Sequence, residues 1–191
     1  MSEPAPRHTL QHRVSTAILD GAAQIFAVQG DQASMNDVAE AAGVARATVY
    51  RYFPNRETLL DELARAAIDD VGQRLAAARI EAVAPEEGVA RAVRALVDVG
   101  DAFVLLARRR VRSDTEGFDR VLAQPLRRLF ERAQAAGDIR DDIASARLTE
   151  SLIGLIVGVL TSIPPLGKED VTAMVTGLFL DGARARGPQR P

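Results

Sequence analysis

The sequence predicts an all-α fold, in which a small N-terminal three-helix domain precedes a larger helical bundle. Alanine, leucine and arginine, which favour helices, dominate the 191 residues, whereas aromatic residues make up only 4%. No run of β-branched residues alternates with the period of two that marks a half-buried strand. Glycines and prolines divide the chain into apolar segments of helical length. Together these observations predict helices and no sheet.

Four regions are expected along the chain. Residues 1–12 form a polar, proline-containing, flexible arm, and residues 187–191 form a frayed tail, because chain ends are poorly ordered unless they are tied down. Residues 13–54 form the three-helix domain. Residues 55–186 form the larger bundle, which is long enough to bury a core of its own.

Start and stop signals define the first two helices. A helix over 13–28 carries apolar residues at helical spacing, and Gly30 is placed to end it. Ser34 and Asp37 resemble a capping box, with aspartate where glutamate or glutamine is usual. This box opens a short second helix that continues through Ala42.

The third and fourth helices follow from a tight turn and two caps. Gly43 permits the positive φ of that turn, and a third helix over 46–53 ends before Pro54. Two short helices joined by a glycine-containing turn of this length form a helix-turn-helix. Asn55 then caps a long fourth helix that continues to about Ile80.

The larger bundle contains four further predicted helices and one loop. The fifth helix is expected over 86–110 and the loop over 113–117. Pro125 suits the first turn of a helix that ends at Gly137. An apolar helix ends at Ile163, and a last helix covers 168–184.

Composition excludes several classes of function. The chain has no cysteine, and its two histidines, His8 and His12, lie in the N-terminal arm. We therefore expect neither a cofactor nor a metal site, and we expect that the protein is not an enzyme. The net charge of −2 argues against a protein that coats nucleic acid by bulk charge. The start of the chain has no apolar signal segment. The apolar stretch 151–163 is shorter than the roughly 18 to 20 residues of a membrane helix, so a cytoplasmic protein is expected.

The predicted third helix presents a polar outer face. Val49 and Phe53 lie four residues apart and therefore share the inner face. The side chains that then turn outward are those of Ala47, Thr48, Tyr50 and Arg51.

These residue types suit double-stranded DNA. Arg51 offers two parallel donors to a guanine edge, and Arg46 can do the same or bind a phosphate. Thr48 and Tyr50 donate hydroxyl groups, and Ala47 can contact a thymine methyl group. The outer face therefore predicts sequence-specific DNA binding.

Four flanking residues complete the predicted DNA-binding surface. Tyr52 can reach the DNA backbone, Asn36 can read an adenine, and the N–H groups that follow Ser34 can bind a phosphate. Arg56, in the first turn of the fourth helix, binds the backbone on the far side. Outside this motif, Tyr50 and Tyr52 would be interpreted as packing residues.

The segment 34–57 is similar to the DNA-binding signature of the tetracycline-repressor (TetR) family, and the resemblance runs from about Val14 to Leu60. It implies a helical dimer that holds a small ligand. It assigns phosphate binding to Thr48, Tyr50, Tyr52 and Arg56. It assigns base reading to Asn36, Arg46, Ala47 and Arg51. Ala45 departs from the serine that is common in the family, which removes an N-cap worth about 1 kcal/mol.

The last two predicted helices carry wide apolar stripes that one chain does not easily cover. Two such helices from each subunit would form an intersubunit four-helix bundle, helped by the close approach that Gly154 and Gly158 permit. The predicted homodimer interface consists of Leu152, Leu155, Ile156, Val159, Val171, Val175, Leu178 and Phe179.

Two further groups of residues have alternative interpretations. One set either lines a pocket for an apolar or amphipathic ligand or forms an ordinary core, and it comprises Phe103, Leu106, Phe118, Leu122, Leu126 and Phe130. The cationic run from Arg108 to Arg112 either binds an anion or is the solvated end of a helix.

The predicted function is transcriptional repression. A dimer occupies a pseudo-palindromic DNA operator, and a small apolar or amphipathic ligand releases it. The alternative is a ligand-independent dimeric regulator, either repressor or activator, whose large domain only dimerises. A closed core without a pocket would favour that alternative.

Overall fold

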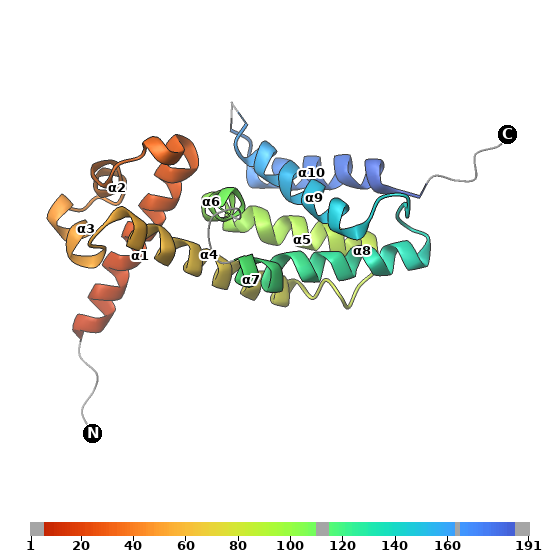
Figure 1. The fold of residues 1–191 in the computed structure, drawn as a ribbon, viewed down its shortest axis with the longest axis horizontal. Coiled ribbons are helices and arrows are strands. Elements are labelled where there is room, and N and C mark those ends of the chain that lie inside the picture. The colour runs from red at the N-terminus through yellow and green to blue at the C-terminus, as the bar shows by residue number, and fades with distance from the viewer. Residues whose placement is uncertain (1–5, 110–114, 163–164, 186–191) are drawn as a thin grey trace, which may run out of the picture. The chain divides into compact units, whose positions relative to one another are not determined.

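The all-α prediction is confirmed. The computed structural model describes residues 6–109, 115–162 and 165–185. Within these ranges every secondary-structure element is a helix (Figure 1). Backbone contacts divide the chain into two compact units, residues 1–66 and 67–191. The boundary lies inside the fourth helix, twelve residues beyond the expected one at residue 54, because the first turns of that helix pack into the first unit. No helix in the described part of the chain is long and apolar enough to cross a membrane.

The first unit contains the three expected helices and the start of a fourth. They are α1 (Pro6–Gln29), a 3₁₀ turn labelled η1 (Gly30–Gln32), α2 (Met35–Ala41), α3 (Arg46–Tyr52) and α4 (Arg56–Ala78). Helix α1 begins seven residues before the predicted start at residue 13, so the prediction of a flexible arm over 1–12 was wrong for Pro6 to His12. That stretch has no breaker after Pro6, and proline is favoured in the first turn of a helix.

The core of the first unit joins all four helices. Its most deeply buried large side chains, at most 1% exposed, are those of Ile18, Phe26, Val38, Val49 and Leu59. Helices α1 and α2 meet at Gly21, where a Cβ atom would lie 2.8 Å from the backbone nitrogen of Ala42. The glycine therefore allows the helix-turn-helix to pack directly on α1.

Local caps position α2 and α4 as predicted. The Ser34 Oγ accepts a hydrogen bond from the Asp37 N–H at 3.3 Å, and the Asp37 Oδ2 accepts one from the Ser34 N–H at 2.8 Å. The capping box thus forms with aspartate as its acid. The Asn55 Oδ1 accepts a hydrogen bond from the N–H of Thr58 at 2.8 Å. Ala45 provides no side-chain cap to α3.

The second unit is a bundle around one core. Its helices are the rest of α4, α5 (Pro85–Val99), α6 (Asp101–Arg109), α7 (Thr115–Phe118), a π-helix labelled η2 (Asp119–Ala123), α8 (Gln124–Ala136), α9 (Ser145–Leu160) and α10 (Lys168–Ala183). Helix α5 packs against α8 and α10, and α9 packs against α8, α10 and α6 (Figure 1).

The bundle departs from the predicted elements at four places. The fifth predicted helix is two helices, because Gly100 adopts a φ of 65° and ends α5. The chain is helical from Thr115, so residues 115–117 are not a loop. The turn before Pro125 widens into a π-helix, because proline has no N–H to donate to the carbonyl of the preceding turn. Helix α9 ends at Leu160, where Thr161 donates its hydroxyl to the carbonyl of Val157 at 2.8 Å.

Candidate nucleic-acid interface

Helix α3 has the inner and outer faces that its sequence predicts. Val49 is fully buried and Phe53, just beyond the helix, is 4% exposed. The outer face is formed by the exposed residues Arg46, Ala47, Tyr50 and Arg51, with Thr48 and Tyr52 half-buried beside them. The helix therefore presents two guanidinium groups and two phenol rings on one short surface.

Each arginine on α3 lies over a tyrosine ring. The Arg46 Cζ is 5.3 Å from the centroid of Tyr50, and the Arg51 Cζ is 5.4 Å from the centroid of Tyr52. Both distances are within the range of a cation–π contact, which restricts the rotamers of the arginine. Sequence reasoning missed these contacts, although the spacing of four between Arg46 and Tyr50 is a usable signal for the first one.

The start of α2 is less open to an anion than expected. Ser34 and Asn36 are exposed, as predicted. The N–H groups of Ser34 and Asp37 are already engaged within the capping box, so they are not available to a phosphate. The backbone hydrogen bond from Ser34, and then its hydroxyl, lower the pKa of Asp37, which keeps a negative charge at this helix end. Of the N–H groups that were expected to bind a phosphate here, those of Met35 and Asn36 remain.

Arg56 contacts its own unit rather than extending outward. Its Cζ lies 4.9 Å from the ring centroid of Phe26, and its Nη2 donates to the carbonyl of Gly30 at 3.4 Å. The side chain is half-buried. The guanidinium thus fastens the start of α4 to the end of α1, a contact that sequence reasoning did not identify.

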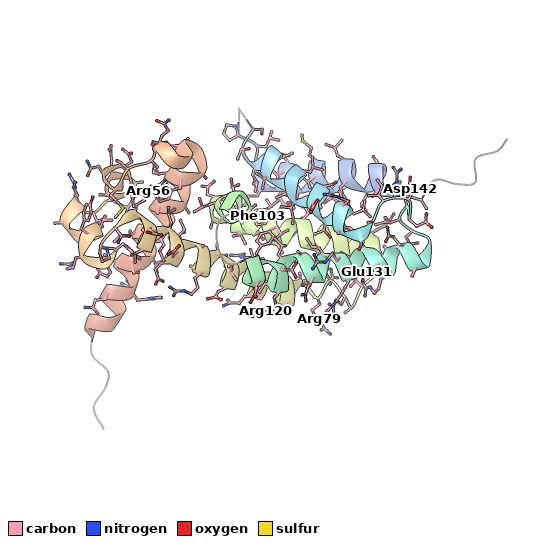
Figure 2. All side chains as sticks on the ribbon, viewed as in Figure 1. Arg56, Arg79, Phe103, Arg120, Glu131 and Asp142 are labelled. Atoms are coloured by element: carbon pink, nitrogen blue, oxygen red, sulfur yellow. The ribbon has the colours of Figure 1, made fainter. Side chains whose placement is uncertain are left out.

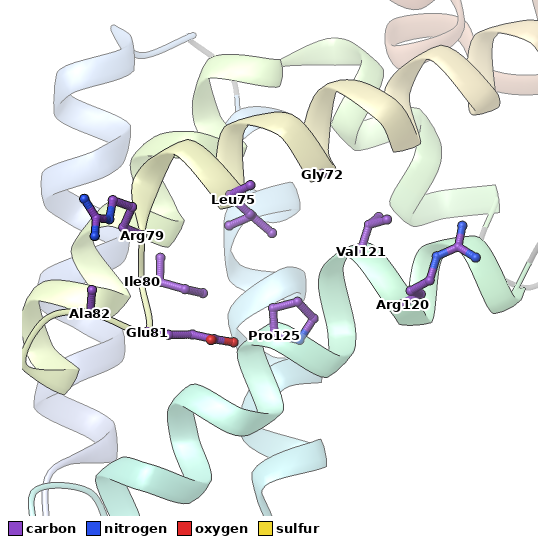
Figure 3. A pocket seen from close by; sticks show the side chains of 10 residues that line it. Gly72, Leu75, Arg79, Ile80, Glu81, Ala82, Arg120, Val121 and Pro125 are labelled. Carbon is purple, nitrogen blue, oxygen red and sulfur yellow. The ribbon is translucent and has the colours of Figure 1, made fainter.

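The predicted ligand-lining residues form core. Phe103, Phe118, Leu122, Leu126 and Phe130 are all at most 2% exposed, and Phe103 lies among the helices of the second unit (Figure 2). The side chain of Leu106 lies outside the described residues, as does most of the run from Arg108 to Arg112. A pocket of about 490 Å³ does exist in this unit, but other residues line it (Figure 3). The alternative interpretation of the six residues, an ordinary core, therefore describes the five whose side chains are visible.

The predicted dimer residues divide into two faces. Five of them are buried in the core of their own chain, namely Leu152, Ile156, Val171, Val175 and Phe179. Their burial corrects the prediction, because α9 and α10 are apolar on both faces and one face belongs to the core of the bundle. Leu155 and Val159 remain half-buried, and Leu178 is 59% exposed. A Cβ atom added at Gly154, Gly158, Gly177 or Gly182 would meet no atom within 4 Å, so these glycines lie on the open face.

Comparison with known proteins identifies the family. The family described as "Bacterial regulatory proteins, tetR family" matches residues 18–63, which include α2 and α3. The HTH-type transcriptional repressor LfrR of Mycolicibacterium smegmatis is 37% identical over 105 residues, or 52% of each chain, so the match spans about half of that relative. The HTH-type transcriptional repressor Rv1474c of Mycobacterium tuberculosis is 30% identical over 141 residues, which cover 67% of this chain and 70% of that one. The chain belongs to the TetR family.

Solved structures resemble this TetR-family chain over both units. The crystal structure of LfrR in complex with proflavine matches 91% of this chain and 97% of that chain, with a TM-score of 0.69 and 22% identity. At this identity the match establishes the fold alone. The arrangement of a helix-turn-helix unit followed by a helical bundle is thus shared with this solved relative.

Proposed function

We propose that the protein is a sequence-specific transcriptional repressor that binds double-stranded DNA as a homodimer. The exposed outer face of α3 carries this proposal, because it offers guanidinium, hydroxyl and methyl groups on a helix of the size that enters a major groove. The names of LfrR and Rv1474c as repressors support it. Arg46, Ala47 and Arg51 read bases, with Asn36 reading a base from the start of α2.

Phosphate contacts come from residues at the rim of this surface. Thr48, Tyr50 and Tyr52 donate their hydroxyl groups to the DNA backbone, which sets the register of α3 without reading sequence. Ser34 lies beside the two N–H groups of α2 that remain for a phosphate. Arg56 contributes mainly by fixing α4 against Phe26, and its charge adds to the attraction of the DNA.

The homodimer forms through the open face of α9 and α10. Leu178 and Met174, four residues apart on α10, are 59% and 43% exposed, and a contiguous apolar patch marks an interaction surface. Glycines on the same face allow the backbones of two subunits to approach closely. Two α9 and two α10 helices would then bury this surface in a four-helix bundle. A two-fold dimer accounts for a pseudo-palindromic operator, since each subunit reads one half-site.

A small molecule regulates the repressor. The second unit contains a pocket, which supports this proposal over the ligand-independent alternative, and the structure of LfrR in complex with proflavine supports it by analogy. Helix α4 supplies residues to both units, so a ligand that shifts its far end can alter the placement of α3. Linkage requires operator DNA to weaken ligand binding by the same factor, typically about 5- to 150-fold.

Selection of bound sequences from a random DNA pool tests the proposal. We expect one enriched sequence with two related half-sites, whose affinity exceeds that of a scrambled duplex at the same salt concentration. Binding that is equal for selected and scrambled duplexes would reject sequence-specific recognition. Arg147→Ala, which removes an exposed cation of the second unit, serves as the control for non-specific charge.

A further inference from the structure

The pocket of the second unit lies at the edge of the apolar core, to which Leu75 and Ile80 belong. Its volume is about 490 Å³, within the roughly 300 to 1,000 Å³ of small-molecule sites. It is bounded by the last turns of α4, the segment 79–82 that follows them, and the start of the helical stretch from η2 into α8 (Figure 3). Leu75, Ile80, Val121 and Pro125 give it apolar walls. These walls suit the hydrocarbon body of an organic molecule.

Unusual backbone occurs on two sides of this pocket. Arg79 has a φ of 49°, the only positive value among non-glycine residues of the described chain. Such a conformation costs about 1 to 3 kcal/mol and is frequent at ligand sites. On the opposite side, the π-helix Asp119–Ala123 places Arg120 and Val121 at the pocket. Single π-helical turns are also concentrated at functional sites.

The segment 79–82 is held firmly in place. The Arg132 guanidinium donates to the carbonyl of Ile80 at 3.1 Å and also to the carbonyl of Glu81. Gly88 packs beneath it, since a Cβ atom there would lie 2.9 Å from the Ile80 carbonyl. The backbone of Glu81 is therefore fixed relative to α8, which determines where its side chain can extend.

Three charged side chains line the pocket, and they point in different directions. The carboxylate of Glu81 points toward Pro125, whereas the guanidinium groups of Arg79 and Arg120 point away from Pro125 (Figure 3). No ion pair of the Glu81 carboxylate is present among the described residues. Because Glu81 is exposed, water screens its charge, so the carboxylate adds a modest preference for a cation to the binding that the apolar walls supply.

We propose that this pocket binds an organic cation with an apolar body, and that Glu81 supplies the countercharge. This site deepens the proposed ligand response, on which its regulatory role rests. The apolar walls hold the body of the ligand, and the Glu81 carboxylate selects for positive charge. An amphipathic anion held by Arg79 and Arg120 is the opposite outcome, and the test below separates the two.

The test uses two probe ions of the same shape and opposite charge, tetraphenylphosphonium and tetraphenylborate. Calorimetric titration of the full chain without DNA should show tetraphenylphosphonium binding about tenfold more tightly than tetraphenylborate, a difference of about 1.4 kcal/mol. Glu81→Gln should remove most of that preference while the protein stays folded, because Glu81 is exposed. Glu116→Gln, on α7 outside the pocket, is the matched control and should keep the preference for tetraphenylphosphonium.

Two results would overturn the proposal. One is tighter binding of tetraphenylborate, which would assign the site to anions. The other is a preference for tetraphenylphosphonium that Glu81→Gln leaves unchanged, which would place the cation elsewhere. Operator affinity is then measured with and without tetraphenylphosphonium. If the cation binds through Glu81 yet operator affinity is unaltered, the site stands and ligand-induced release fails instead.

Discussion

The guanidinium of Arg51 lies over the ring of Tyr52, with 5.4 Å between the Arg51 Cζ and the ring centroid. This contact joins a proposed base-reading residue to a proposed phosphate-binding one. An arginine held by an aromatic ring loses less side-chain entropy when it binds a base, because its rotamers are already restricted. Tyr52 is therefore expected to position Arg51 in addition to contacting DNA.

Substitutions at Tyr52 separate these two contributions. Tyr52→Phe keeps the ring. It should weaken binding to all DNA sequences to a similar degree and leave the base preference unchanged. Tyr52→Leu removes the ring and should also reduce discrimination at the base pair read by Arg51. The measurement is the affinity of each variant for the selected operator and for single-base variants of it. Equal base discrimination in the two variants would show that the ring does not position Arg51.

The contact at Gly21 predicts an unusual sensitivity of the first unit. In Gly21→Ala the new methyl group would lie 2.8 Å from the Ala42 backbone nitrogen, which cannot move without displacing α2. We expect a loss of about 1 to 3 kcal/mol in the free energy of unfolding. Gly72→Ala is the control within a helix, since its methyl group would lie 3.5 Å from Val121 and should stabilise the protein by up to about 1 kcal/mol. Denaturant unfolding that shows equal effects of the two changes would contradict the close packing of α1 on α2.

The capping box predicts a pH dependence at the start of α2. Hydrogen bonds from Ser34 lower the pKa of Asp37 in the folded protein, so the charged carboxylate favours folding. The stabilisation is present above the ordinary pKa of an aspartate and is lost as the pH falls through the lowered value. Unfolding measured from neutral to acidic pH at one protein concentration should show this loss in the wild type and not in Asp37→Ala. Asp20→Ala, an exposed change on α1, should keep the wild-type slope. A slope unchanged by Asp37→Ala would mean that the box adds nothing to stability.

Local signals made the first unit predictable. Ser34, Gly43 and Asn55 each act within one helical turn, so the positions of α2, α3 and α4 follow from the sequence with errors of one or two residues. Gly100 was harder to interpret, because a glycine within an apolar helical pattern is often tolerated. Its φ of 65° shows that here it ends a helix.

Contacts between distant segments were not predictable in the same way. Leu152 and Leu155 are equally apolar, and only the packing of the bundle shows that the first is buried in its own chain. Gly72, Glu81 and Arg120 meet at one pocket although they belong to three separate segments. The contact of Arg56 with Phe26 likewise depends on how α1 packs against α4. Helical periodicity carries no information about contacts between distant segments.

The exposed part of α10 predicts how the chain dimerises. Leu178→Asp places a charge on the open apolar face, and a charge buried without a partner in an interface is strongly unfavourable. We expect the wild type to sediment as a dimer at micromolar concentration and Leu178→Asp to sediment as a monomer. Ala135→Asp, an exposed change on α8, should remain dimeric. A monomeric wild type, or a variant that stays dimeric, would count against this interface.

Selection with Arg51→Ala tests most directly whether the outer face of α3 reads DNA sequence. The variant and the wild type are each used to enrich bound sequences from the same random DNA pool. We predict that Arg51→Ala binds the wild-type operator about 1 to 3 kcal/mol more weakly and loses its preference at one base pair in each half-site, with the other positions unchanged. Enrichment of the same sequence with the same discrimination at every position would contradict the account.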